Sequence, residues 1–219
     1  MKAFVHCLVF VIGASIANVH GQFGTAWQRT PVVTVISSGE DSRLALVDEA
    51  IAHWNKTFEE LGSAFRLARA KRHRISIPEA DLASLSLAVV GGGVSGPLRM
   101  PESFGSLPGD LNIFLGESEF VSFAGPFDKE GKRIVGIRGS KYPPMTLPNV
   151  TRNVLVHKIG HAIGLGHNKD PAMLMCGRPA PCRPNLFSSA EPKVFPLTDA
   201  EKRQLLLMYP RDWKPKGRV

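Results

Sequence analysis

Three histidines stand close together between His157 and His167, in the sequence H-K-I-G-H-A-I-G-L-G-H. Two histidines four residues apart on a helix project from the same face, because four residues make just over one turn. Gly164 lets the chain leave that helix, so His167 can approach from the loop beyond it. Three neutral imidazole nitrogens, with a fourth position left to water, form the arrangement of a catalytic zinc site. We therefore predict that His157, His161 and His167 bind Zn²⁺.

The spacing H-x-x-x-H-x-x-G-x-x-H resembles that of the metzincin clan of zinc endopeptidases, and the flanking sequence is most similar to the matrixins. The clan has a tight turn that carries a methionine beneath the metal. Met175 matches this methionine better than Met173, because the family usually has Leu-Met and one further residue before the turn. The segment Leu197–Tyr209 resembles the matrixin C-terminal helix. The resemblance extends over most of the chain, from Thr30 to Pro210.

This resemblance implies an α+β fold, with a twisted, mostly parallel five-stranded sheet, two long helices and a C-terminal helix. It implies that Met175 forms the floor of a zinc site. The activity of the family is endopeptidase hydrolysis of peptide bonds by zinc-bound water. An extended peptide or protein would bind along an edge strand near Phe120 to Gly125 by strand addition. Proteins of this family can also bind a structural Ca²⁺, but no feature of this sequence identifies a calcium site.

Lys158 occupies the position at which peptidases of this kind carry a glutamate, which takes the proton from the zinc-bound water. The lysine ammonium has no lone pair to accept a proton. It also places a positive charge near Zn²⁺, where repulsion costs about one to several kcal/mol. We therefore expect Lys158 not to function as the general base, and peptidase activity to be absent or much reduced.

Three alternatives would change this expectation. Zinc and burial could lower the pKa of Lys158 until its amine is neutral and able to accept a proton. Glu117 or Glu119 could supply the base, although nothing in the sequence places either residue at the metal. A single base change converts a glutamate codon into a lysine codon, so the third alternative is that this residue has been altered.

The N-terminus has the outline of a secretory signal, with Lys2, an apolar run from Ala3 to Ile12, and then small residues. Cleavage could follow Ala17 or Gly21, and we assign residues 1–21 to the signal and 22–219 to one matrixin-like metallopeptidase domain. The apolar run is too short to span a membrane. We expect a monomer that is secreted or extracellular, or periplasmic in a Gram-negative host.

Two cysteines remain once Cys7 is removed with the signal. Cys176 and Cys182 would form a disulfide directly after the methionine turn, stabilising it by about 2 kcal/mol. The alternative is that Cys176 is a metal ligand or a free thiol. We favour the disulfide, because three histidines already supply the protein's share of the metal ligands.

The net charge of the chain is +8, and many of its cations gather in two clusters. Such clusters could bind polyanions, acidic glycans or a membrane face, or could be solvated surface. No nucleic-acid motif accompanies them, so no nucleic-acid partner is expected. A cationic binding protein with a structural zinc is therefore a rival hypothesis. The clusters are Arg66, Arg69, Lys71, Arg72 and Arg74, and Arg211, Lys214, Lys216 and Arg218.

Apolar periodicity predicts helices over Arg43–Glu60 and Asn149–Ile163. Thr198 and Glu201 form a capping box that opens a last helix, which Pro210 ends. The triple glycine Gly91–Gly93 predicts a loop. Strands are expected at Pro31–Ser37, Arg74–Ile77, Leu111–Leu115, Phe120–Ala124 and Arg133–Arg138.

Overall fold

The strands of the protein form one mixed sheet. A computed structural model describes residues 26–90, 100–105, 107–126, 131–177 and 191–216, and in it the strand order is β2-β1-β3-β5-β4. Neighbouring strands are parallel except β4, which lies at one edge and runs antiparallel to β5. The expected α+β class with a mostly parallel, five-stranded sheet is confirmed. The strands are β1 (Val33–Ser37), β2 (Lys71–Arg74), β3 (Leu111–Leu115), β4 (Phe123–Pro126) and β5 (Arg133–Ile137).

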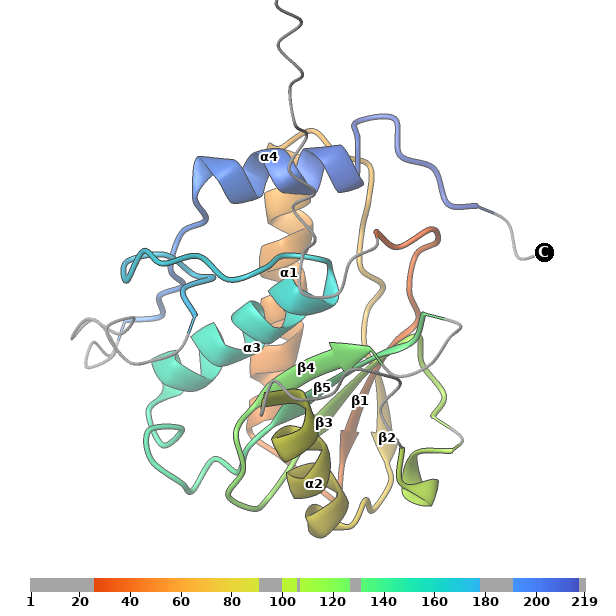
Figure 1. Cartoon of the computed structure of the whole chain (residues 1–219), viewed down its shortest axis with the longest axis vertical. Helices are drawn as coiled ribbons and strands as arrows, with labels where there is room; N and C mark the ends of the chain where they lie inside the picture. The colour runs from red at the N-terminus through yellow and green to blue at the C-terminus, as the bar shows by residue number, and fades with distance from the viewer. Residues whose placement is uncertain (1–25, 91–99, 106, 127–130, 178–190, 217–219) are drawn as a thin grey trace, which may run out of the picture.

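Two long helices, α1 (Arg43–Glu60) and α3 (Pro148–Ala162), pack against each other and cover one face of the sheet (Figure 1). Alternate residues of the strands, such as Val33 and Val35, meet the apolar side of α1 in the main core. Trp54 is fully buried there, as its place in the helical pattern predicts. The α1 prediction is confirmed in full, and α3 begins and ends one residue before the predicted bounds.

The last helix, α4 (Asp199–Met208), crosses the molecule on the side away from the sheet (Figure 1). Both hydrogen bonds of the predicted capping box are present, because the Thr198 side chain accepts from the Glu201 N–H and the Glu201 side chain accepts from the Thr198 N–H. Tyr209 follows the helix and is fully buried. Its hydroxyl donates to the Ile163 carbonyl at 2.9 Å, which ties α4 to the end of α3.

A fourth helix, α2 (Glu79–Val90), covers the opposite face of the sheet and was not predicted. It contributes Leu82 and Leu85 to a second core. All five residues of β3 are buried, which is the pattern of a strand covered on both faces. The fold therefore has three layers, with helices on both faces of the sheet. The second core also contains Ile36, Phe104, Leu107, Phe114, Phe120, Phe123 and Ile134.

Four strand predictions have bounds that differ from the structure. The strands expected over Pro31–Ser37 and Arg133–Arg138 are shorter, as β1 at Val33–Ser37 and β5 at Arg133–Ile137, and the other two are displaced along the chain. The strand expected over Arg74–Ile77 is β2 at Lys71–Arg74, an edge strand of charged residues with no apolar alternation. The strand expected over Phe120–Ala124 is β4 at Phe123–Pro126. Phe120 is buried because it packs in the second core, not because it lies in the sheet.

Within the described ranges, no helix combines the length and apolar character needed to cross a membrane. The proposed signal peptide, residues 1–21, lies outside those ranges, and so does the loop predicted at Gly91–Gly93. The division into a signal and one domain therefore stays a prediction.

Candidate metal centre

Helix α3 brings two of the predicted ligands to one place. His157 and His161 are one turn apart and are both buried, with side chains on the same face of the helix. Their rings are 4.6 Å apart between centroids and perpendicular to each other. The helix ends at Ala162, one residue after the second histidine.

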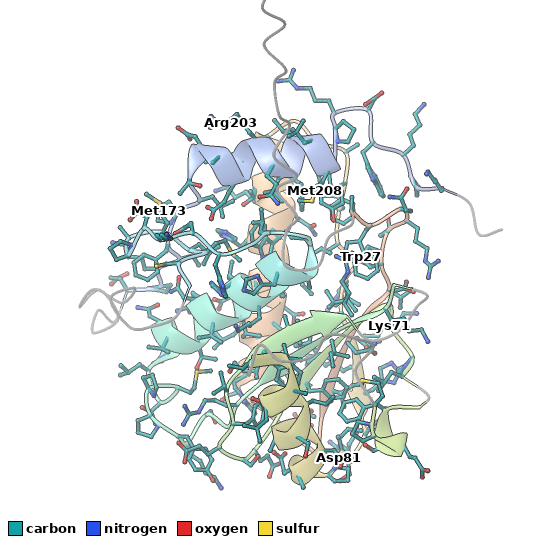
Figure 2. The ribbon with its side chains drawn as sticks, in the orientation of Figure 1. Trp27, Lys71, Asp81, Met173, Arg203 and Met208 are labelled. Carbon is teal, nitrogen blue, oxygen red and sulfur yellow. The ribbon has the colours of Figure 1, made fainter. Side chains whose placement is uncertain are left out.

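The turn that follows α3 returns the chain toward these histidines. Gly164 has φ of +107°, a backbone conformation that residues with side chains rarely adopt. A side chain there would also place its Cβ 2.7 Å from the sulfur of Met208, the last residue of α4 (Figure 2). The N–H of Leu165 then donates to the Gly160 carbonyl at 3.0 Å. This reversal requires glycine and delivers His167 to the site.

The three histidines form a group in which the ligand atoms all lie within 4.8 Å of one another. The Nε2 atoms of His161 and His167 are 2.9 Å apart. Nitrogens that bind one tetrahedral zinc at about 2.0–2.1 Å lie roughly 3.3 Å apart. The group could therefore hold a metal ion. His167 is exposed while the other two are buried, so the group opens to solvent on the side of His167.

Backbone carbonyls orient the two buried rings. The Nδ1 of His157 lies 2.7 Å from the Leu174 oxygen, and the Nδ1 of His161 lies 2.8 Å from the Leu165 oxygen. A carbonyl only accepts, so each Nδ1 carries the proton and each Nε2 keeps its lone pair. Such bonds hold metal-binding histidines in the required tautomer and orientation.

The electrostatic surroundings keep the buried imidazoles neutral. Burial is the main cause that lowers the pKa of both His157 and His161 well below the usual value. The positive charge of Lys158 lowers both pKa values further. Neutral imidazole is the form that binds metals. Lys158 itself is half-buried on α3, between the two histidines in sequence.

Met175 packs directly beneath the helix that carries the histidines. It is fully buried, whereas Met173 is half-buried. Gly160 makes this contact possible, because a Cβ there would lie 2.7 Å from the Met175 sulfur. The Met175 carbonyl also accepts from the Asn168 N–H at 2.9 Å, which joins the methionine turn to the residue after His167.

Glu201 links α4 to the loop of the third histidine, a connection that the sequence did not reveal. One of its carboxylate oxygens accepts from the Asn168 side chain at 2.6 Å, and the other accepts from the Thr198 N–H at 2.8 Å. The residue is 6% exposed. The capping box predicted the second bond but not the first, because Asn168 is distant in sequence.

Replacing Glu201 with glutamine is therefore expected to weaken metal binding by about 10-fold, because an amide cannot accept both hydrogen bonds through two oxygens. Asp199→Asn is the matched control, since Asp199 lies in the same helix and is 81% exposed. Competition with a chelating dye would measure both affinities. Equal losses in the two variants would contradict a role for Glu201 in placing His167.

Only one of the two cysteines of the predicted disulfide lies within the described residues. Cys176 is buried and disulfide-bonded. Cys182 lies outside the described residues, so the pairing of Cys176 with Cys182 stays a prediction. The alternative of a metal ligand is not favoured, because the histidine group does not include Cys176.

The candidate substitute bases have other partners. Glu117 accepts a hydrogen bond from the Ser38 hydroxyl, and Glu119 forms an ion pair with Arg138 at 2.8 Å. No carboxylate among the described residues belongs to the histidine group. Both glutamates are thus engaged by groups outside the histidine cluster.

Part of the first basic cluster is neutralised by neighbouring groups. Arg72 forms an ion pair with Asp48, and Arg74 forms one with Glu40, each at 3.1 Å. Arg69 and Lys71 are exposed, as are Arg211, Lys214 and Lys216 of the second cluster, while Arg218 lies outside the described residues.

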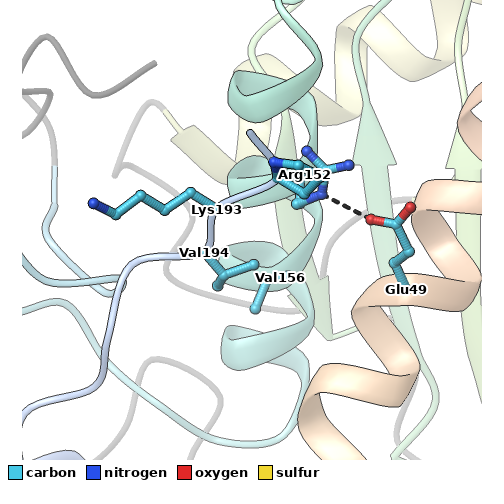
Figure 3. A pocket seen from close by; sticks show the side chains of 6 residues that line it. Glu49, Arg152, Val156, Lys193 and Val194 are labelled. Atoms are coloured by element: carbon cyan, nitrogen blue, oxygen red, sulfur yellow. Dashed lines mark hydrogen bonds and ion pairs between the residues drawn. The ribbon is translucent and has the colours of Figure 1, made fainter. Parts of the chain in front are cut away.

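A cleft of about 190 Å³ lies beside α3 and α1 (Figure 3). Arg152 of α3 forms an ion pair with Glu49 of α1 at 2.7 Å across it. None of the three histidines lines this cleft, so it is separate from the metal group. Its lining is Glu49, Arg152, Val156, Pro192, Lys193 and Val194.

No protein-family model and no curated protein matches the chain. The resemblance to metzincins therefore rests on the histidine spacing, the methionine turn and the C-terminal helix alone.

Proposed function

We propose that the protein is a secreted, matrixin-like zinc protein whose peptidase activity is absent or much reduced. The observation that carries the proposal is the group of His157, His161 and His167, with Lys158 beside it where a base would be needed. The mixed sheet with β4 at its edge is in keeping with the expected scaffold.

The donor set favours zinc over the hard cations. Three imidazole nitrogens suit Zn²⁺ and other late transition metals, whereas Ca²⁺ and Mg²⁺ take oxygen ligands. His157 and His161 are already neutral and oriented by carbonyls, so little reorganisation precedes binding. His167 would complete the set from the exposed side and leave one position for water or a ligand.

Lys158 accounts for the proposed loss of activity. A bound zinc would supply a polarised water, but hydrolysis also needs a group that takes a proton from it. Lys158 is half-buried, and its long side chain can keep the ammonium in contact with solvent. A lysine ammonium has no lone pair, so it cannot accept that proton. No described carboxylate belongs to the histidine group, and Glu117 and Glu119 have other partners, so we favour reduced activity over a working peptidase with a substitute base.

Peptide binding could persist without cleavage. β4 is an edge strand, and no other described strand pairs with its outer side. Just before it, the backbone of Val121 is already held by Ser86 of α2, which donates to the Val121 carbonyl at 2.7 Å and accepts from its N–H at 3.1 Å. Strand addition would therefore begin at Phe123, three residues beyond the start predicted from the sequence.

The proposed zinc site predicts that the purified protein contains about one zinc ion per chain. His161→Ala is expected to weaken binding at least about 100-fold, because it removes one of three ligands from a site of this kind. His73→Ala is the control, since His73 lies on β2 outside the group. Elemental analysis and chelator competition would measure these values. A zinc-free wild type, or equal affinities in the two variants, would contradict the proposal.

A further inference from the structure

The fold brings the two basic clusters of the sequence to one side of the molecule. Phe65, in the segment between α1 and β2, packs against Tyr209 and Trp213 of the segment that follows α4, with ring centroids 4.1 and 4.9 Å away. A Cβ at Gly62 would lie 3.5 Å from Nε of Arg211. Figure 1 shows the C-terminal segment leaving α4 beside the chain that runs from α1 to β2. Cations that are far apart in the sequence therefore share one surface.

This surface, which we call the basic face, is formed by cations of residues 62–71 and 209–216. No ion pair within the described ranges engages any of its members, whereas the neighbouring Arg72 and Arg74 are neutralised by Asp48 and Glu40. Asp212 is the one acid in these two stretches of sequence. The positive charge of the face is therefore left to the solvent. Its members are Arg66, Arg69, Lys71, Arg211, Lys214 and Lys216, all exposed except the half-buried Arg66.

We propose that the basic face binds a sulfated polysaccharide, a chain whose anionic groups repeat along its length. The cations of the face also follow one another along two stretches of chain, and none of them lines the cleft beside α3 and α1. A surface on which one sign of charge gathers attracts polyanions and speeds their association. Arginine adds a planar guanidinium that can donate two parallel hydrogen bonds to one oxyanion, and Arg69 and Arg211 are exposed for this contact.

A lipid surface and a nucleic acid match the basic face less well. Binding to a membrane surface combines charge with the burial of apolar groups. Single-stranded nucleic acids stack their bases on aromatic side chains, but Trp213 is half-buried and its ring packs against Phe65 and Tyr209. The large hydrophobic side chains exposed in the described part of the chain all lie outside the two stretches, and they are Leu87, Val90, Leu147 and Leu207.

The test titrates a heparin oligosaccharide of defined length into the full protein by calorimetry at about 0.15 M salt. Arg69→Gln and Lys214→Gln, one from each stretch, are each expected to weaken binding about 3-fold, and the double variant about 10-fold. Arg203→Gln is the control, because Arg203 is an exposed residue of α4 that lies well apart from Lys71 (Figure 2). Raising the salt from about 0.05 to 0.2 M should weaken wild-type binding at least about 10-fold, since a linear polyanion releases counterions on binding.

Several outcomes would overturn the proposal. These are an absence of heparin binding by wild type, an equal loss in Arg203→Gln and Arg69→Gln, or a loss in Arg69→Gln without one in Lys214→Gln. Tighter binding of an oligonucleotide of matched charge would assign the basic face to nucleic acid instead. Tighter binding of phosphatidylserine vesicles would assign it to a lipid surface.

The proposal is independent of the proposed metal site. No member of the basic face belongs to the histidine group, so the heparin affinity of wild type is expected to be the same with and without a chelator. A zinc-free wild type that binds heparin would contradict the proposed function and leave this inference standing. Heparin binding that disappears in the chelator would contradict the assignment to the basic face.

Discussion

Replacing Lys158 with glutamate is expected to raise the rate of peptide cleavage by the zinc-loaded protein by about 10²–10⁴-fold, the usual contribution of a general base. The three histidines, their carbonyl partners and Met175 are already in place around that position. The change restores a proton acceptor and also removes a positive charge from beside the metal. Cleavage of a fluorogenic extended peptide, with and without a chelator, measures the effect.

Lys158→Gln separates the two contributions of that change. Glutamine removes the positive charge without adding a base, so its cleavage rate is expected to stay near that of wild type. A rate in Lys158→Gln equal to that in Lys158→Glu would show that charge repulsion alone suppresses activity. Chelator-sensitive cleavage by wild type at the rate of the glutamate variant would show that another group serves as the base.

The features that the sequence predicted correctly are those with local signals. Helix α1 follows from apolar residues at intervals of three and four, and α4 from the capping box of Thr198 and Glu201. The three histidines converge because helical spacing brings two of them together and Gly164 returns the third. Each of these arguments needs only a short stretch of chain.

The features that were missed depend on contacts between distant segments. Helix α2 has Leu82 and Leu85 at helical spacing and acidic residues in its first turn, yet the expectation of two long helices left no place for it. Strand β2 has no apolar alternation, and only pairing with β1 defines its bounds. The hydrogen bond from the Asn168 side chain to Glu201 joins residues far apart in the sequence, so no local sequence pattern predicts it.

Trp54 joins the core to the helix that carries the histidine group. It is fully buried on α1, and its indole N–H donates to the Val156 carbonyl of α3 at 3.0 Å. Val156 precedes the first histidine. A Cβ at Gly160 would lie 3.0 Å from the indole ring, so the same side chain also lies against the turn of α3 between His157 and His161.

Trp54→Ala is therefore expected to lower the free energy of unfolding by about 3–5 kcal/mol, because it removes a large buried side chain and leaves a cavity between α1 and α3. Trp54→Phe should cost less, since it keeps most of the apolar surface and loses chiefly the hydrogen bond to Val156. Trp213→Ala is the control, because Trp213 is only half-buried at the edge of the core. Urea unfolding of the metal-free protein measures the free energy of unfolding of all three variants without a contribution from bound metal. Similar losses in Trp54→Ala and Trp213→Ala would show that the contact between α1 and α3 is not the one that holds the histidine-bearing helix in place.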